Sequence, residues 1–289
     1  MAASIQVRRL ESAPRTSPRS AAWLAGALMA GAMGIAVVPF VWAFLTALQT
    51  ERQIYAFPPR LLPDPVTLAN YALEFQQGLG RGLMNSALAA FSAVVLTVVT
   101  ASMCAYPLAR LRFRGSGVLL LLIVAPMMVP GLVNLIPTFM ILASLGLLDT
   151  YTGLILVYWV HALPVSIWIL RAFYQTLPLE LEEAATVDGA SRLQVLVQII
   201  TPIAQPALVA VAVIDFLAAW NDYVIAAIMT SSAEMRTAQV FLYANIGDVY
   251  TNWGGLMASA IVVTLPVLLV FAFLQRQFID GLIAGALKG

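Results

Sequence analysis

Charged side chains are scarce in this chain of 289 residues. They make up 10% of the sequence, whereas hydrophobic residues make up 61%. Soluble domains carry roughly 25% charged and roughly 45–50% apolar residues, because a globule in water must cover its surface with polar groups. The composition therefore excludes an ordinary soluble domain and indicates an integral membrane protein.

Cysteine, histidine and lysine are nearly missing, since each occurs once, as Cys104, His161 and Lys288. One cysteine cannot form an internal disulfide, and no metal-ligand spacing accompanies it. The sequence also lacks a GxxxxGK[ST] phosphate loop and a paired nucleophile and base. We therefore expect no catalysis and no bound cofactor or metal in this chain. The net charge of +1 gives no reason to expect a nucleic-acid partner.

Long apolar runs dominate what is present. A membrane-spanning helix needs about 20 apolar residues, and barrel strands are about half as long. The sequence therefore predicts an all-α, polytopic membrane protein. Its six expected transmembrane helices are Ala21–Leu48, Ser86–Tyr106, Val118–Met140, Gly153–Leu170, Ala207–Met229 and Leu256–Phe273.

The basic residues predict the orientation, because cytosolic loops carry an excess of Arg and Lys. The first apolar run exceeds a signal-peptide core of about 7–15 residues, so we expect a retained span. We predict a basic cytosolic tail (1–20), a first helix (21–48), an extracytoplasmic loop (49–84), a transmembrane core (85–275) and a cytosolic tail (276–289). Eleven basic residues then lie inside: Arg8, Arg9, Arg15, Arg19, Arg110, Arg112, Arg114, Arg171, Arg192, Arg276 and Lys288. Four lie outside: Arg52, Arg60, Arg81 and Arg236.

The cytosolic segment 174–206 interrupts the apolar pattern with a predicted pair of short helices. Thr176 can cap the first helix, and Pro178 fits its first turn. Gly189 is expected to end it in a left-handed conformation. Ser191, with a glutamine three residues later, forms a capping-box pattern that starts the second helix. The segment is either a docking surface for a partner or an ordinary loop between two spans.

The stretch "EEAATVDGA" followed by "IITP" resembles the signature of the inner-membrane permease subunits of bacterial ABC importers. That signature reads Glu-Ala-Ala, three residues, Gly, nine residues, Ile-x-Leu-Pro. Thr201 departs from it, standing where leucine is usual. The matching residues are Glu183, Ala184, Ala185, Gly189, Ile199 and Pro202.

The likeness extends through "AYPLARLRFRGSG", "LILVYWVHALPVSIWILRAFYQTLP", "AAWNDYVIAAIM" and "QFIDGLIAGALKG". These stretches resemble the six-span subunit of the carbohydrate-uptake branch of that binding-protein-dependent family. The resemblance is close from Asn85 to Gly289 and loose from Ala21 to Met84. It implies a sugar, polyol or glycerol-phosphate as the transported solute.

The resemblance further implies a type I ABC importer permease fold in the bacterial inner membrane. Its coupling helix would sit in a groove of a partner ATPase. The partners implied are two ATPase subunits that bind ATP and magnesium, a second homologous permease subunit and an extracytoplasmic solute-binding protein. The residues expected to serve ATPase coupling are Glu182, Glu183, Ala184, Ala185, Asp188, Gly189, Ala190 and Pro202.

Polar residues inside the spans are the candidates for a substrate pathway, because an ionisable group at membrane depth is costly. Asp215 and Asp222 are seven residues apart, which would place them on one helix face. Trp220 and Asn221 adjoin them and are candidates for sugar contacts. A structural role stays open, since Asp222 could be hydrated at the interface and the Trp-Asn-Asp stretch could orient spans.

The third span carries Pro126, Pro130 and Pro137 around Asn134, which predicts a bent, pore-lining helix. His161 is a further pathway candidate or an interhelical hydrogen-bond donor. An alternative function also remains: a secondary transporter driven by an ion gradient, with Asp215, Asp222 or His161 as the proton relay.

Overall fold

The computed structural model describes residues 19–111, 113–247 and 251–286, which form helices and their connections. Within these ranges the only extended pairing is an isolated bridge between Ile246 and Thr251. The all-α prediction is confirmed. The predicted basic tail up to residue 18, together with Arg112 and Lys288, lies outside the described residues.

Four described helices are long and apolar enough to span a membrane, and six spans result if each of two bent helix pairs is counted as one. The last long helix continues through residues 276–286, so the predicted C-terminal tail is mostly a continuation of that helix. The four long helices are α1 (Arg19–Ala47), α4 (Leu79–Arg110), α7 (Tyr151–Tyr174) and α14 (Trp253–Ala286).

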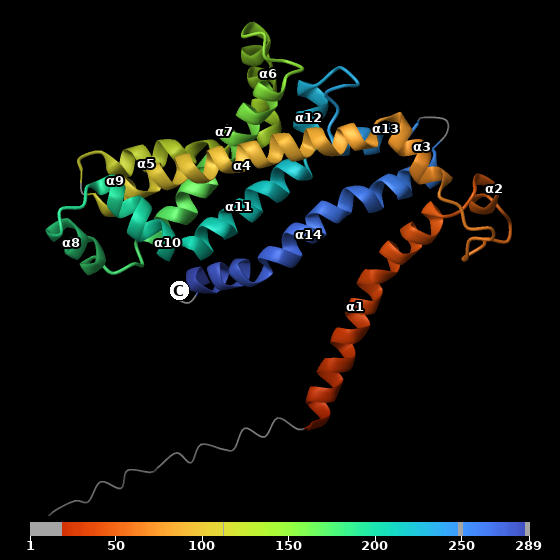
Figure 1. Cartoon of the computed structure of the whole chain (residues 1–289), viewed down its shortest axis with the longest axis horizontal. Helices are drawn as coiled ribbons and strands as arrows, with labels where there is room; N and C mark the ends of the chain where they lie inside the picture. Colours follow the sequence, from red (N-terminus) through yellow and green to blue (C-terminus); the bar gives the residue numbers. More distant parts are fainter. Residues whose placement is uncertain (1–18, 112, 248–250, 287–289) are drawn as a thin grey trace, which may run out of the picture.

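Helix α4 lies at the centre of the bundle, where it packs mainly against α7 and α11 (Gln205–Trp220) (Figure 1). Its buried face consists largely of small residues, among them Ala93 and Ala101, at helical spacing. Large side chains such as Phe91 and Val95 point outward and are exposed. Small residues let helix backbones approach closely, which is how spans associate without a hydrophobic driving force in lipid.

The third predicted span is broken, as its prolines indicated. Its two halves meet at 97°. Val129 is extended at the break, because a residue before proline is disfavoured in the helical conformation. The pieces are α5 (Ser116–Val124), the 3-10 turns Ala125–Met128 and Gly131–Asn134, and α6 (Leu135–Ser144).

The fifth predicted span is not one continuous helix, which corrects the sequence interpretation. Helix α11 ends at Trp220, and a separate short helix, α12 (Val224–Met229), follows. The sixteen residues of α11 extend about 24 Å, less than the roughly 30 Å hydrocarbon core. An 80° bend separates α11 from the helical segment Arg192–Ile203 before it.

Helix α1 diverges from the rest of the bundle in Figure 1 and contacts α14. Three glycines give α1 an exposed surface with little side-chain bulk. A Cβ built on Gly26, Gly31 or Gly34 would meet no heavy atom within 4 Å. This face therefore packs on nothing within the described chain.

The end of the molecule opposite α8 is tied together by α3 (Ala69–Gln77). Asn70 donates from Nδ2 to the carbonyls of Ala47 (2.9 Å) and Gln49 (2.8 Å), beyond the end of α1. Glu74 is fully buried, and its Oε2 accepts hydrogen bonds from Asn245 (2.9 Å) and Ser259 (2.8 Å). The predicted extracytoplasmic loop thus contains structured helices: α2 (Glu51–Ile54), α3 and the first turns of α4; α13 (Ala238–Ala244) packs beside them.

A clamp at Asp149 joins the α6–α7 loop to the residues after α12. The Asp149 N–H donates to the Met229 carbonyl at 2.8 Å. Its Oδ1 accepts from the N–H groups of Ser231 (2.9 Å) and Ser232 (3.1 Å). Burial opposes ionisation of this carboxyl, but the two backbone donors outweigh it and lower the pKa of Asp149.

Candidate functional site

The charged segment 174–206 forms a compact projection at one end of the bundle (Figure 1). Helix α8 (Glu180–Val187) ends where the sequence predicted, because Gly189 takes a φ of +86°. The N–H of Ala190 donates to the Ala185 carbonyl at 2.9 Å, and the N–H of Gly189 donates to Thr186 at 3.1 Å. This pair of bonds is a Schellman motif, which satisfies carbonyls that a helix end leaves open.

The next helix begins at Ser191, also as predicted. Ser191 accepts from the Gln194 N–H at 3.4 Å, and its own N–H donates to the Gln194 side chain at 2.8 Å. The segment comprises α9 (Arg192–Gln194), a π-helical stretch (Val195–Ile200) and α10 (Thr201–Ile203), which contains Pro202.

The predicted start of α8 was wrong. The helix begins at Glu180, and Thr176 and Pro178 both precede it. The Thr176 hydroxyl donates instead to the Phe173 carbonyl at 2.8 Å, at the end of α7. The residue at the N-cap position of α8 is Leu179, which makes no side-chain cap hydrogen bond, so Thr176 lies too early in the chain to cap the helix.

Helix α8 has two distinct faces. Glu182 and Ala185 point inward and are 4% and 9% exposed. Glu183, Ala184 and Val187 point outward. The residues expected to act together in ATPase coupling are therefore divided: Glu183, Ala184, Asp188 and Gly189 are exposed, Ala190 is half-buried, and Glu182 and Ala185 are not available to a partner.

Glu182 is paired within its own chain. Its Oε1 lies 2.6 Å from Nε of Arg110, the last residue of α4, and both side chains are 5% exposed. The Tyr106 hydroxyl donates to Glu182 Oε2 at 2.8 Å. From the sequence alone Arg110 is only an orientation signal, because no local pattern links it to a residue 72 positions away.

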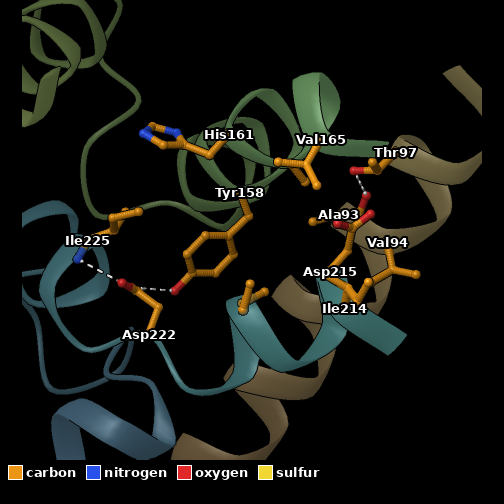
Figure 2. Close-up of a pocket in the computed structure, with 13 residues that line it drawn as sticks. Ala93, Val94, Thr97, Tyr158, His161, Val165, Ile214, Asp215, Asp222 and Ile225 are labelled. Carbon is orange, nitrogen blue, oxygen red and sulfur yellow. Dashed lines mark hydrogen bonds between the residues drawn. The ribbon is translucent and has the colours of Figure 1, made fainter. Parts of the chain in front are cut away.

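A cavity of about 190 Å³ lies among α4, α7, α11 and α12 (Figure 2). Asp215 and Asp222 both line it, together with Ala218 and Ala219, which the sequence placed between them. Thr97, Tyr158 and His161 contribute the other polar groups. The cavity therefore holds two carboxylates and no arginine or lysine.

Asp215 is 6% exposed, and its carboxylate is hydrogen-bonded to a hydroxyl rather than paired with a cation. The Ser166 Oγ lies 2.9 Å from Oδ2 and 3.1 Å from Oδ1. Ser166 was not among the predicted pathway residues, since a serine in an apolar helix carries no signal of its own. A carboxylate held by one hydroxyl retains acceptor capacity toward the cavity.

Asp222 reaches the cavity for a different reason from the one expected. It lies beyond the end of α11, so the two aspartates do not share a helix face. Its carboxylate accepts from the N–H groups of Ile225 (3.2 Å) and Ala226 (2.9 Å), which caps α12. The Tyr158 hydroxyl donates to the same carboxylate at 3.0 Å (Figure 2).

Trp220 and Asn221 do not line this cavity, which corrects their grouping with Asp222. Trp220 is 2% exposed, and its Nε1 donates to the Val263 carbonyl of α14 at 3.1 Å. Asn221 is exposed and donates from Nδ2 to Leu217 at 2.9 Å. Both residues stabilise the end of α11.

His161 and Asn134 share a second cavity of about 650 Å³ between the broken α5–α6 span and α7. His161 borders both cavities, and its ring points away from Asp215 in Figure 2. Its Nδ1 lies 2.9 Å from the Val157 carbonyl of its own helix. The structure therefore does not place His161 in a hydrogen-bonded chain with the aspartates.

Comparison with known proteins agrees with this architecture. A family model described as "Binding-protein-dependent transport system inner membrane component" matches residues 93–283. The trehalose permease SugB of Mycobacterium tuberculosis is 35% identical over 89% of this chain and 94% of its own. The sulfoquinovosyl glycerol permease SmoH of Agrobacterium fabrum is 33% identical, over 87% and 88%.

Among solved structures, a bacterial ABC transporter that imports the acidic polysaccharide alginate superposes with a TM-score of 0.80. The match covers 92% of this chain and 99% of that one at 23% identity, and it confirms the type I importer permease fold. The chain thus belongs to the binding-protein-dependent transport system inner membrane component family and is a permease subunit of an ABC importer.

Proposed function

We propose that this permease forms half of the translocation pathway for a sugar or a related polyol or glycerol-phosphate solute. An extracytoplasmic binding protein delivers the solute. The observation that carries the proposal is the agreement among relatives, which are permeases for trehalose, sulfoquinovosyl glycerol and diacetylchitobiose. The diacetylchitobiose permease NgcG of Streptomyces coelicolor is 31% identical over 97% of this chain.

Energy comes from two partner ATPase subunits, which bind ATP and magnesium. The sequence supports this division of labour, because it has no phosphate-binding loop. The outward face of α8, with Glu183, Ala184 and Val187, is the contact for the ATPase. Its defined helix ends support that role, since a rigid projection transmits displacement that a flexible loop would absorb.

A second, homologous permease subunit completes the pathway. The glycine face of α1 supports this partner, because small residues allow close helix packing and none of the described residues covers that face. The distribution of eleven basic residues against four supports an arrangement with both termini in the cytosol. In this arrangement α8 faces the ATPases, and α2 and α3 lie at the extracytoplasmic end.

The cavity at Asp215 is the part of the pathway that this chain contributes. Asp215 accepts hydrogen bonds from solute hydroxyls, because its carboxylate has no cationic partner among the cavity-lining residues. Tyr158 and Asp222 hold the break between α11 and α12 in place beside it. His161 and Asn134 line the neighbouring cavity along the same route.

Purification of the tagged chain in mild detergent, followed by mass spectrometry, tests the assembly. We expect an ATPase and a second permease to co-purify. Uptake of radiolabelled trehalose and diacetylchitobiose by intact cells then tests energy coupling. Uptake that persists when the proton gradient is collapsed and ATP is maintained agrees with the proposal. Uptake that ceases under that condition would establish ion-gradient-driven transport instead.

A further inference from the structure

We propose that the buried pair of Arg110 and Glu182 is the link through which movement of α8 reaches the membrane spans. This inference rests on the proposed function, since the ATPases supply that movement. The Nε of Arg110 and Oε1 of Glu182 are 2.6 Å apart, and each side chain is 5% exposed. Glu182 therefore acts as a positioning residue on the inner face of α8, whereas its neighbour Glu183 faces the partner.

The pair joins helix ends that are distant in sequence. Arg110 is the last residue of α4, and its Nη2 also donates to the Leu177 carbonyl (2.8 Å) in the connection between α7 and α8. Tyr106, one turn earlier on α4, donates to the other carboxylate oxygen of Glu182 at 2.8 Å. Arg192 at the start of α9 interacts with the same Tyr106 hydroxyl.

Helix α7 is held to the same point. The Arg171 Nε donates to the Leu108 carbonyl of α4 at 3.2 Å. Helix α8 thus contacts the end of α4 directly through Glu182, whereas α7 and α9 contact the last turns of α4 through Arg171 and Arg192. The buried ion pair fixes the relative position of α4 and α8, and the charge-assisted hydrogen bonds from Tyr106 to Glu182 and from Arg110 to Leu177 reinforce it, so these elements move together.

Helix α4 carries the displacement to the cavity. The helix runs unbroken from Arg110 back to Leu79, and its residues Ala93, Val94 and Thr97 line the cavity at Asp215. A shift of α8 that pulls on Arg110 therefore changes the cavity wall about four turns away. The exposed face of α8 receives the movement, and the buried face passes it on.

The reactivity of a cysteine placed in the cavity tests whether movement of α8 changes the cavity wall. The reference is the purified permease–ATPase complex carrying Cys104→Ser and Ala218→Cys, since Ala218 lines the cavity and is exposed. The probe is N-ethylmaleimide, and the readout is the change in its reaction rate on addition of ATP, magnesium and orthovanadate. ATPase co-purification is measured in parallel, because a merely destabilised variant would lose both.

Glu182→Gln is expected to retain the ATPase and to reduce the nucleotide-induced change in reaction rate about tenfold, an effect of the size seen when residues that couple two sites are changed. The matched control is Glu180→Gln, an exposed glutamate of the same helix, which should respond as the reference does. The exchange Arg110→Glu with Glu182→Arg should restore part of the response. Arg110→Lys keeps the charge but cannot contact both Glu182 and the Leu177 carbonyl. Its nucleotide response should lie between those of the reference and Glu182→Gln.

A full response in Glu182→Gln with the ATPase bound would overturn the inference and leave the proposed function intact. If Glu182→Gln does not assemble, Arg110→Lys decides, and an undiminished response there overturns the inference equally. A reference complex that retains its ATPase but shows no nucleotide response would count against the proposed function itself.

Discussion

Two carboxylates of this permease are buried in opposite ways. Glu182, in α8, meets a guanidinium at 2.6 Å and a tyrosine hydroxyl at 2.8 Å. Asp215, in the cavity, meets one serine hydroxyl and no cation among the residues that line the cavity. The first group has its charge neutralised by its own chain, and the second does not.

The difference separates a structural carboxylate from one that is available to a ligand. A buried ion pair fixes the geometry of its elements, and removal of one partner leaves an uncompensated charge. A carboxylate with a single hydroxyl partner keeps lone pairs for a solute and contributes less to the fold. We therefore expect substitutions at Glu182 to affect stability and coupling, and substitutions at Asp215 to affect solute affinity.

Glu182→Ala should produce the largest loss of stability. The variant leaves the Arg110 guanidinium buried without its carboxylate, a change that typically costs about 3–5 kcal/mol. Thermal unfolding of the detergent-solubilised complex measures it, with Glu180→Ala as the exposed control. Equal melting temperatures for the two variants would contradict the assignment of Glu182 as a buried partner.

Gly255→Ala tests a third buried carboxylate, Glu74, which is held by an amide and a hydroxyl. A Cβ at Gly255 would collide with Glu74 Oε1 and with the Asn252 side chain. Forcing atoms into a packed site costs about 1–3 kcal/mol, so the melting temperature should fall. Gly117→Ala is the control, because a Cβ there meets nothing within 4 Å.

Asp215→Asn should weaken apparent solute affinity while the ATPase still co-purifies. A hydrogen bond to a charged group contributes about 1.5–3 kcal/mol, so the apparent KM should rise roughly tenfold or more. Uptake kinetics with radiolabelled trehalose or diacetylchitobiose measure the change. Asn221→Ala, outside the cavity, should leave KM unchanged. If KM of Asp215→Asn equals that of the unsubstituted protein, Asp215 has a structural role and does not bind the solute.

Asp149→Asn should have the smallest effect, and that effect should depend on pH. The pKa of Asp149 is lowered from its ordinary value of 3.8, so its ionised form stabilises the folded state. That contribution is present above the ordinary pKa and is lost as pH falls through the lowered one. Melting temperatures from neutral pH to below pH 3.8 should therefore fall more steeply in the wild type than in Asp149→Asn. Parallel curves would refute the role of the clamp.

The end of α8 and the start of α9 were predictable from sequence, because the residues that form them bond to partners close in sequence. Gly189 closes bonds within five residues, and Ser191 pairs with Gln194 three residues away. The partner of Glu182 was not predictable, because Arg110 approaches it only when α4 and α8 pack together. The packing of α4 against α8 decides that Glu182 is buried and Glu183 exposed, and the local sequence pattern does not.

The cavity was predicted in part, and for an incorrect reason. The seven-residue spacing assumed an unbroken helix, whereas the chain turns after Trp220 because Asp222 caps α12. Trp220 was grouped with the aspartates by adjacency, but its indole fills the space toward α14. Tyr158 and Ser166 carried no sequence signal, since their role arises from contacts across three helices.

Co-purification of the ATPase with two neighbouring variants tests the central claim most directly. Glu183→Arg reverses a charge on the exposed face of α8, and Glu182→Gln removes one from the buried face. The account predicts that Glu183→Arg releases the ATPase, whereas Glu182→Gln retains it. An ATPase that stays bound to Glu183→Arg with normal transport-coupled hydrolysis would contradict it.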